Sequence, residues 1–335
     1  MLKKTRYGRK LNLKNIFSSL ELADIADRYS LNYFDIGSRG GFQNDLHSLA
    51  FAVEVVGFEP DPIEFKHLLT ISPEPWKSIN YLPFGISGQS GEQNLYIPTD
   101  PQSASLMKHN VAIGEKFDKP QFFEVDRIEK IQTLSLNDAL EKTKFKSIDF
   151  MKIDIEGAEM SVFKSSPEVM KGVLAIKTEI SFLPFREDQP LASDIDNFLR
   201  HAGFELMDII EPSHWRRNGY LIHPYYSTEM PPYSRAQIVQ ADYLYFRNPE
   251  SVGGDITKLL KLSLIALSFG YFDHALIILE LPEVEKFLDS EFKLSPIEIV
   301  APASKIYGRK AFLKAFYQQG RNLIPFLRYM KNLLN

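Results

Sequence analysis

The chain of 335 residues contains no cysteine. Disulfide bonds, thiolate metal sites and a cysteine nucleophile are therefore excluded. The sequence also has no serine–histidine–acid spacing, no phosphate-binding loop and no zinc signature. The usual sequence marks of serine hydrolases, nucleoside triphosphatases and zinc enzymes are thus missing.

Long apolar runs are missing as well. The longest stretch without charge near the C-terminus, Leu262–Phe272, is too short to cross a bilayer. No apolar segment typical of a signal peptide follows the first ten residues. The net charge of −4 gives no support for broad electrostatic binding of nucleic acid. We therefore expect a cytoplasmic protein with no nucleic-acid partner.

Positive charge is concentrated at the two ends of the chain. The charged side chains before Glu21 and after Glu298 are all lysine or arginine. Solvated tails are the simpler interpretation of these segments. The alternative is a peripheral contact with anionic lipid or another polyanion, which the two basic ends would share.

Between the ends, short apolar segments alternate with amphipathic ones. This alternation predicts an α/β fold with a doubly wound, mostly parallel sheet and helices on both faces. An added hairpin is expected from residues 93–98 and 121–126, around a long polar loop, Thr99–Pro120. Helices are expected at Gln43–Phe51, after Pro62, at Ser135–Lys142, near Met160 and at Leu191–Ala202. The expected strands are Leu31–Asp35, Val53–Phe58, Tyr81–Ile86, Ile148–Ile153, Val173–Ile180, Phe204–Ile210 and Ala241–Arg247.

Three regions follow from this pattern. Residues 1–30 form a basic N-terminal segment with a helix at Asn15–Tyr29, and residues 31–248 form the domain that contains the sheet. Pro249–Gly254 marks a boundary, and residues 249–335 are predicted to form a C-terminal helical extension. We expect this extension to pack on the main domain or on a second subunit, which would make the protein a homo-oligomer.

The stretch Asp149–Glu159 places several acids and a lysine in and just after a short apolar strand. Asp154 and Glu156 share strand parity, so both can project from one face. Burying this charge is costly unless a ligand, a cation or Lys152 compensates it. Because open α/β sheets bind ligands at the carboxyl ends of their strands, the stretch predicts an active-site edge. Glu159 either belongs to that edge or caps the following helix.

A second candidate site is the turn Asp35-Ile-Gly-Ser-Arg-Gly-Gly41, between an expected strand and a helix. Its glycines let the backbone approach a ligand, and Glu59 ends the next strand, where an acid can accept both hydroxyls of a ribose. Phe42 stands where a dinucleotide fingerprint needs its last glycine. Asp35 repels phosphate but suits an amino group. The turn therefore favours S-adenosylmethionine over a nicotinamide cofactor.

These motifs resemble those of the FkbM-type methyltransferases, a branch of the class I S-adenosylmethionine-dependent enzymes. The resemblance covers residues 31–247 and implies a seven-stranded class I methyltransferase-like sheet. It also implies methyl transfer, usually to an oxygen and often on a sugar. Arg39 departs from the pattern, because class I enzymes usually carry a small or amide residue there. The matching segments are Phe34-Asp-Ile-Gly-Ser-Arg-Gly-Gly41, Val56-Gly-Phe-Glu-Pro-Asp61, Ile148–Glu159, Thr178-Glu-Ile-Ser-Phe182 and Gln240-Ala-Asp-Tyr-Leu-Tyr-Phe-Arg247.

The resemblance also implies which residues bind the cofactor. Glu59 would hold the ribose, and Asp61 and Ser87 would lie beside the adenine. The residues assigned to the methionine part lie in the glycine turn: Asp35, Gly37 and Gly41. Two neighbours in the same motifs complete the cofactor set: Ser38 and Pro60.

Methyl transfer from a sulfonium is an in-line displacement, so the acceptor oxygen, the methyl carbon and the sulfur must be aligned. A sugar hydroxyl is a poor nucleophile until it loses its proton, so a base or a metal is expected nearby. Asp154 is the first candidate for either role. Glu156 and Glu179 complete a carboxylate cluster that could hold Mg²⁺, and Lys152 would otherwise neutralise it.

The loops supply further candidates. His214, beside Trp215 and Arg216, is the strongest candidate among the histidines for a base over the acceptor. Surface exposure or packing of the loop is the simpler interpretation of the remaining candidates. These are His109 and His223 as bases, Ser103 and Ser105 as contacts to the acceptor, and four tyrosines that could stack on a sugar ring: Tyr220, Tyr225, Tyr226 and Tyr233.

The expected function is that of an S-adenosylmethionine-dependent O-methyltransferase acting on a hydroxyl of a saccharide or glycoconjugate. Two alternatives stay open. One is a non-catalytic scaffold with a methyltransferase-like fold, and the other is a nicotinamide-dependent oxidoreductase.

Overall fold

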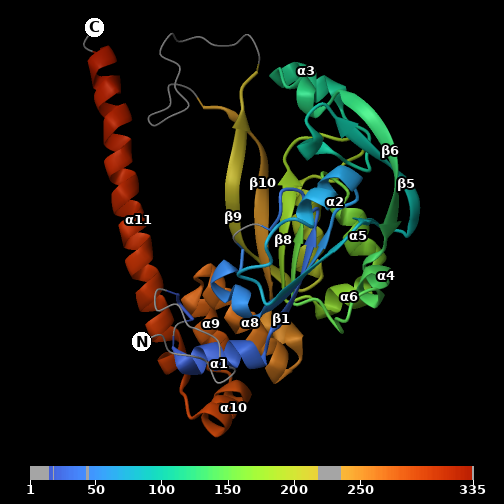
Figure 1. Ribbon diagram of the computed structural model, residues 1–335. Coiled ribbons are helices and arrows are strands. Elements are labelled where there is room, and N and C mark those ends of the chain that lie inside the picture. The colour runs from blue at the N-terminus through green and yellow to red at the C-terminus, as the bar shows by residue number, and fades with distance from the viewer. Residues whose placement is uncertain (1–14, 18, 43–44, 218–234, 334–335) are drawn as a thin grey trace.

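The computed structural model describes residues 15–17, 19–42, 45–217 and 235–333. At its centre is a seven-stranded sheet in the order β3-β2-β1-β7-β8-β10-β9 (Figure 1). Strand β10 runs antiparallel to both of its neighbours, and the other pairs are parallel. The predicted α/β fold with a mostly parallel seven-stranded sheet is confirmed. The strands are β1 (Leu31–Ile36), β2 (Val53–Phe58), β3 (Ser78–Leu82), β7 (Phe150–Ile153), β8 (Ala175–Ser181), β9 (Phe204–Trp215) and β10 (Gln237–Arg247).

The sheet separates two hydrophobic cores, as the alternating side chains of β1 illustrate. Leu31 and Tyr33 pack into one core, whereas Phe34 and Ile36 pack into the other. The first core is closed by α1 (Leu20–Arg28), η1 (His47–Ala52), α8 (Ile256–Phe269), α9 (Phe272–Leu279) and α10 (Pro282–Phe292). The second is closed by α4 (Leu136–Glu141), α5 (Glu159–Ser165), α6 (Pro167–Gly172) and α7 (Ala192–His201).

The C-terminal helices pack on the sheet of their own chain. Leu262, Leu264 and Ile265 of α8 share a core with β1 and β2, and the short helix η4 (Pro249–Val252) leads into α8. The last helix, α11 (Pro296–Leu333), starts beside α9 and then extends away from the body of the molecule (Figure 1). Across the described residues, none of the helices has the length and apolar character needed to cross a membrane. The division of the chain into three regions stays a prediction.

Two predicted elements of the sheet domain are wrong. The expected third strand, Tyr81–Ile86, is two strands in different sheets, because Pro83 lacks the N–H that would continue the ladder. The expected helix at Gln43–Phe51 is, where described, the single 3₁₀ segment η1. The residue before it, Leu46, has a left-handed φ of 54°, which prevents a continuous α-helix.

A second, three-stranded sheet faces the carboxyl ends of the main strands. It has the order β4-β6-β5, and its strands are β4 (Gly85–Ile86), β5 (Gly91–Pro98) and β6 (Val125–Leu134). The expected antiparallel hairpin exists, but the partner of β5 is residues 125–134 and not 121–126. The segment expected as a polar loop contains η2 (Pro101–Ser103) and α3 (Val111–Phe117), and η3 (Pro120–Phe122) begins at its last residue. Helix α2 (Pro62–Leu68) follows β2.

Candidate active site

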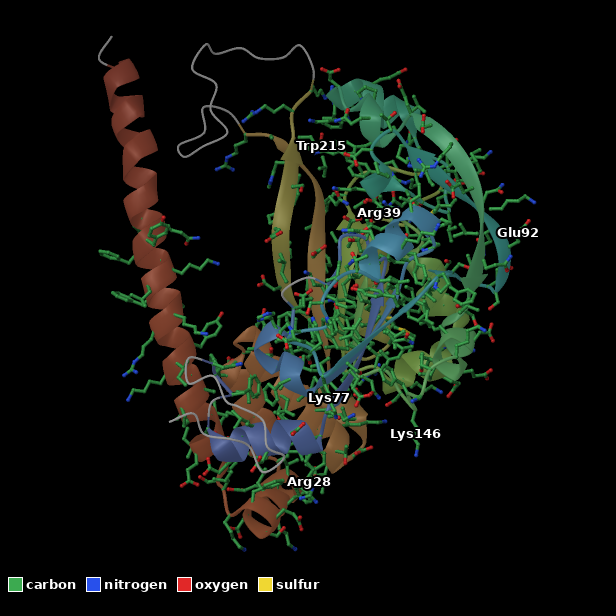
Figure 2. All side chains as sticks on the ribbon, viewed as in Figure 1. Arg28, Arg39, Lys77, Glu92, Lys146 and Trp215 are labelled. Carbon is green, nitrogen blue, oxygen red and sulfur yellow. The ribbon has the colours of Figure 1, made fainter. Side chains whose placement is uncertain are left out.

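A cavity of about 370 Å³ lies at the carboxyl ends of β1, β2, β7 and β8. One wall is polar and comes from the turns that follow these strands of the main sheet. The opposite wall carries apolar side chains of the second sheet, Ile86, Leu95 and Ile131, together with η2. Figure 2 shows Arg39 in the region between the two sheets. The position is the usual ligand site of an open α/β sheet, and the volume suits a small molecule.

Half of the predicted cofactor residues form part of the cavity wall: Gly37, Gly41, Glu59 and Pro60. The other half are buried beside it without lining it: Asp35, Ser38, Asp61 and Ser87. The hydroxyls of Ser38 and Ser87 donate hydrogen bonds to the backbone oxygens of Asp35 and Gln89. The geometry thus divides the predicted set into residues that face a ligand and residues that hold the turns in place.

Lys152 connects the glycine turn to the acidic turn, residues 154–158 between β7 and α5. Its Nζ donates to the carbonyl oxygen of Gly37 at 2.9 Å and lies 3.3 Å from Asp154 Oδ2 and 3.8 Å from Asp35 Oδ1. Burial raises the pKa of Asp35 to about 6, against the opposing effect of Lys152. Lys152 therefore compensates two of the acids at this edge, as one of the sequence interpretations expected.

Gly37 is needed for a close approach of the two turns. It has a φ of +84°, and a Cβ built on it would lie 2.0 Å from the carbonyl oxygen of Asp154. We expect Gly37→Ala to lower the free energy of unfolding by about 1–3 kcal/mol, because the backbone of the acidic turn must move. Urea unfolding measures this loss.

Gly40→Ala is the matched control for that prediction. Gly40 also has a positive φ, +77°, but nothing lies within 4 Å of a Cβ added there. The control therefore carries the cost of the backbone conformation without the collision. If the two variants lost the same free energy of unfolding, the close approach of the two turns at Gly37 would not explain the loss.

Glu59 and Asp61, the two acids that follow β2, differ from each other in their surroundings. Glu59 is 3% exposed, and its Oε1 accepts the N–H of Asp61 at 2.8 Å. Burial raises the pKa of Glu59 to about 7, and Arg39 is the main group that opposes this rise. Asp61 uses Oδ1 to cap α2 through the N–H of Ile63, while its Oδ2 lies 2.8 Å from Arg39 Nη2. Its carboxylate is thus engaged within the protein.

The acidic turn and the neighbouring strand β8 bring together the three predicted catalytic carboxylates. One oxygen each of Asp154, Glu156 and Glu179 lies within 4.8 Å of the others, and all three residues line the cavity. Glu156 has a left-handed φ of 58°, a conformation that non-glycine residues adopt rarely and mostly where surrounding contacts impose it. Glu159 holds this turn, because its Oε1 accepts the N–H groups of Ile155 and Gly157. Glu159 therefore braces the turn before α5 and does not cap that helix, whose N-cap residue, Ala158, has no side-chain cap hydrogen bond.

Two of the three carboxylates already have a cationic partner. Lys152 pairs with Asp154, and Arg186 Nη2 lies 2.7 Å from Glu156 Oε2. Among the described residues, no ion pair reaches Glu179. Burial, reinforced by Asp154, raises the pKa of Glu156 to about 8 and that of Glu179 well above its ordinary value. A cation entering the cavity would stabilise the ionised forms of both acids.

Arg186 was not predicted from the sequence. It is completely buried, and its Nη2 also donates to the backbone oxygen and to Oγ of Ser103. Ser105 donates to the backbone oxygen of Glu156 at 2.8 Å. The two serines proposed as acceptor contacts therefore tie η2 to the acidic turn. The only local signal was an isolated arginine after the apolar residues Leu183-Pro-Phe.

The histidines lie apart from the carboxylates. His214 is exposed on β9, with Nδ1 3.1 Å from the backbone oxygen of Pro212, and does not line the cavity. Its neighbour Trp215, near the end of the β9–β10 hairpin in Figure 2, stacks on Phe185. His109 is buried and its pKa is lowered to about 4 by burial and Arg186, so it is neutral near pH 7. The remaining loop candidates fall outside the described residues: Tyr220, His223, Tyr225, Tyr226 and Tyr233.

A family model described as the methyltransferase FkbM domain matches residues 35–206, which include the glycine turn, Glu59 and the three carboxylates. No curated protein matches the chain. A similar solved structure is precorrin-6y C5,15-methyltransferase from Geobacter metallireducens GS-15, with 7% identity, 73% of this chain and 95% of that chain covered, and a TM-score of 0.30. Another is the 23S rRNA methyltransferase ErmE, with 11% identity, coverage of 86% and 95%, and a TM-score of 0.29.

The prediction that the protein has no nucleic-acid partner is corrected by these matches, since one of the similar structures is an rRNA methyltransferase. The exclusion depended on the net charge, which is a sum over the whole surface and does not describe one cleft. A likeness of this degree identifies no acceptor for the present chain. Net charge alone therefore gives no ground for excluding nucleic acid as an acceptor.

Proposed function

This chain belongs to the FkbM methyltransferase family, and from that premise we propose that it transfers the methyl group of S-adenosylmethionine to a hydroxyl oxygen of a saccharide. The observation that carries the proposal is the charge of the cavity wall. Four carboxyl groups line it, from Glu59, Asp154, Glu156 and Glu179, against the two cations Arg39 and Lys152. Burial raises the pKa of Glu59, Glu156 and Glu179, so a cationic ligand would stabilise their ionised forms. A wall with this balance suits a cofactor that carries a sulfonium and an ammonium group and no phosphate.

The polar groups that line the cavity can bind such a cofactor. Glu59 lines the wall, and among the described residues its Oε2 has no hydrogen-bond partner, so it can accept from a ribose hydroxyl. Gly40 and Gly41 line the wall with positive φ values, which brings the backbone close to a ligand. When bound, S-adenosylmethionine supplies the electrophilic methyl group.

Asp154 is the proposed base. It lines the cavity with a side chain that is 30% exposed, and its Oδ2 lies 3.3 Å from Lys152 Nζ. The acceptor hydroxyl donates to Asp154 and loses its proton to that carboxylate. At the same time the oxygen bonds to the methyl carbon, and the carbon–sulfur bond breaks. The apolar side chains of the second sheet exclude water from the opposite side.

A divalent cation fits the cluster less well than a base does. The three carboxylates are close enough to share an ion, and oxygen is the ligand that Mg²⁺ prefers. Lys152 and Arg186, however, already compensate Asp154 and Glu156. An added ion would have to displace these partners, so the proposed transfer uses Asp154 as a base and no Mg²⁺.

Calorimetric titration with S-adenosylmethionine and with its demethylated product tests the cofactor. We expect both to bind, and no heat at millimolar concentration would contradict the proposal. An NADH titration is the control, because binding of NADH would favour an oxidoreductase.

Transfer of a radiolabelled methyl group to a panel of oligosaccharides and RNA then tests the acceptor. Labelled saccharide is the expected product. Labelled RNA would replace the saccharide assignment and keep the methyltransferase. Cofactor binding with no acceptor ever labelled would favour the scaffold alternative.

A further inference from the structure

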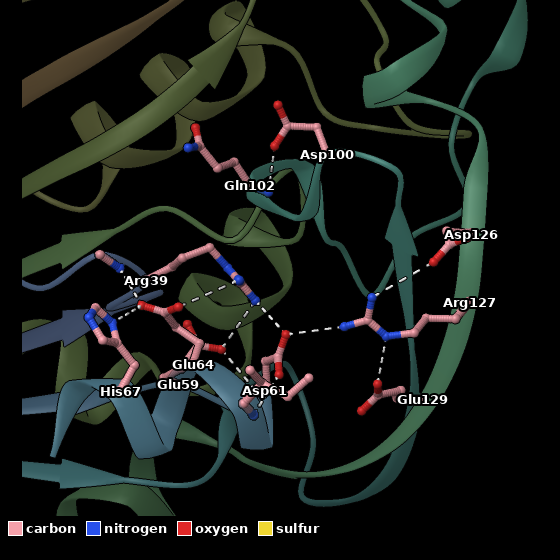
Figure 3. Close-up of polar contacts among 12 residues, drawn as sticks. Arg39, Glu59, Asp61, Glu64, His67, Asp100, Gln102, Asp126, Arg127 and Glu129 are labelled. Atoms are coloured by element: carbon pink, nitrogen blue, oxygen red, sulfur yellow. Dashed lines mark hydrogen bonds and ion pairs between the residues drawn. The ribbon is translucent and has the colours of Figure 1, made fainter. Parts of the chain in front are cut away.

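Arg39 stands where the resemblance leads one to expect a small or amide residue, and it lines the cavity beside Glu59. Its Nη2 lies 2.8 Å from Asp61 Oδ2 and 3.8 Å from Glu59 Oε1, and its Nη1 lies 4.0 Å from Glu64 Oε2 (Figure 3). One guanidinium thus faces three carboxylates, two from the segment after β2 and one from α2. An amide at this position could not compensate their charge.

Asp61 takes the closest of these contacts and is held from two sides. Arg127 of β6 approaches the same Oδ2 at 3.5 Å (Figure 3), while Oδ1 caps α2. Glu64 Oε1 accepts the N–H of Gly40 at 2.9 Å, which attaches the backbone of the glycine turn to the same helix. Asp61 and Glu64 therefore bind the turn and its arginine and do not face a ligand.

Glu59 differs because it keeps acceptor capacity toward the cavity. Its Oε1 accepts the N–H of Asp61 and faces Arg39, whereas Oε2 has no hydrogen-bond partner in the part of the chain that the structure describes. Two adjacent ribose hydroxyls are two donors, and an ionised carboxylate is an acceptor at both oxygens. A protonated carboxyl group would turn one of these oxygens into a donor.

We propose that Arg39 is a positioning residue of the ribose site, which keeps Glu59 an anionic acceptor for the two ribose hydroxyls and fastens the glycine turn to α2. The inference depends on the proposed function, because it assumes that the cofactor brings a ribose to Glu59. Arg39 acts through Glu59 and does not need to touch the cofactor.

Burial explains why Glu59 needs this cation. The charged groups that face Glu59 are Arg39 from the turn after β1, Asp61 beyond β2 and Glu64 from α2. Burial, Asp61 and Glu64 raise the pKa of Glu59 to about 7, and Arg39 is the facing group that lowers it. Arg127 contacts Asp61, and His67 contacts Glu64. Neither of them faces Glu59 directly. A neutral side chain at position 39 would raise the pKa of Glu59 further, so that the protonated form would predominate at neutral pH.

The test is the affinity for S-adenosylhomocysteine measured by calorimetry between about pH 5.5 and pH 9, a range that brackets the Glu59 transition. Since the ionised form binds, the affinity of the unchanged protein should rise with pH through a midpoint near 7. In Arg39→Gln the midpoint should move upward. Each unit of that shift makes binding about 10-fold weaker below both midpoints, and the loss should disappear at high pH.

Three further variants isolate the effect. Arg39→Lys keeps the charge and should keep the midpoint near that of the unchanged protein. Arg127→Gln removes the other cation of Asp61 but none that faces Glu59, so its midpoint should also stay. Glu59→Gln removes the titrating group and should bind weakly with no dependence on pH. Arg39→Met, which preserves the packing of the aliphatic stem, replaces Arg39→Gln if the latter does not fold.

Two results would overturn the inference in different ways. A neutral residue at position 39 that weakens binding by the same factor at every pH would show a purely structural role, and the proposed function would stand. No binding of S-adenosylhomocysteine to the unchanged protein at any pH would overturn the proposed function, and the inference with it.

Discussion

Replacing Asp154 by asparagine is expected to lower kcat for methyl transfer by a factor of about 10²–10⁴, the usual contribution of a positioned base. The amide has the shape of the carboxylate but cannot take the proton of the acceptor hydroxyl. Lys152 keeps Gly37 and Asp35 as partners in the variant, so the two turns should stay in place. Initial rates at saturating cofactor and acceptor measure the loss, and calorimetry with S-adenosylhomocysteine should show nearly unchanged affinity.

Asp196→Asn is the control for general effects of removing an acid. Asp196 of α7 accepts hydrogen bonds from Arg200 and from Tyr245 of β10 and does not line the cavity, so its variant should keep the rate. A rate for Asp154→Asn within threefold of the unchanged enzyme would reject Asp154 as the base. Glu179→Gln would then be the next variant, because Glu179 lines the same cavity.

The largest expected loss of stability follows from replacing Arg186 by methionine. Arg186 is 0% exposed and pairs with Glu156, so the variant leaves a nearly buried carboxyl group without its cation and Ser103 Oγ without its donor. Removing one partner of a buried ion pair costs about 3–5 kcal/mol. Urea unfolding with a constant m-value would report this loss as a lower midpoint.

An exposed pair provides the comparison for Arg186. Arg200 is 52% exposed and pairs with Asp196 at 2.9 Å, so Arg200→Met should cost no more than about 1 kcal/mol. The double variant Arg186→Met/Glu156→Gln should regain part of the loss, because it removes the uncompensated charge. Similar losses for Arg186→Met and Arg200→Met would mean that the buried pair does not hold the acidic turn.

The sheet could be predicted because its signals are local. Strands such as Val53–Phe58 are short apolar runs next to helical patterns, and the observed bounds of β2 are the same. The acids at the ends of β1, β2 and β7 could be placed at one edge because parallel strands bring their carboxyl ends together. The error at Tyr81–Ile86 arose because an apolar run was given more weight than Pro83 inside it.

The contacts that shape the site could not be predicted in the same way. Arg186 and Ser103 are 83 positions apart, and no periodic pattern links them. Arg39 was recognised as a departure from the family pattern, but its pairing with Asp61 and the approach of Arg127 depend on how the two sheets face each other. Such contacts are properties of the assembled fold and leave no trace in a short window of sequence.

The packing of α8 on the main sheet has a consequence for how the protein is made. Leu262, Leu264 and Ile265 complete a core that begins with Leu31 and Tyr33 of the first strand. During synthesis this apolar surface stays exposed to solvent until the residues of α8 have left the ribosome. By then every strand of the sheet has already left the ribosome. Chaperone binding to nascent chains should therefore persist past the last strand and fall once this late helix is free to dock.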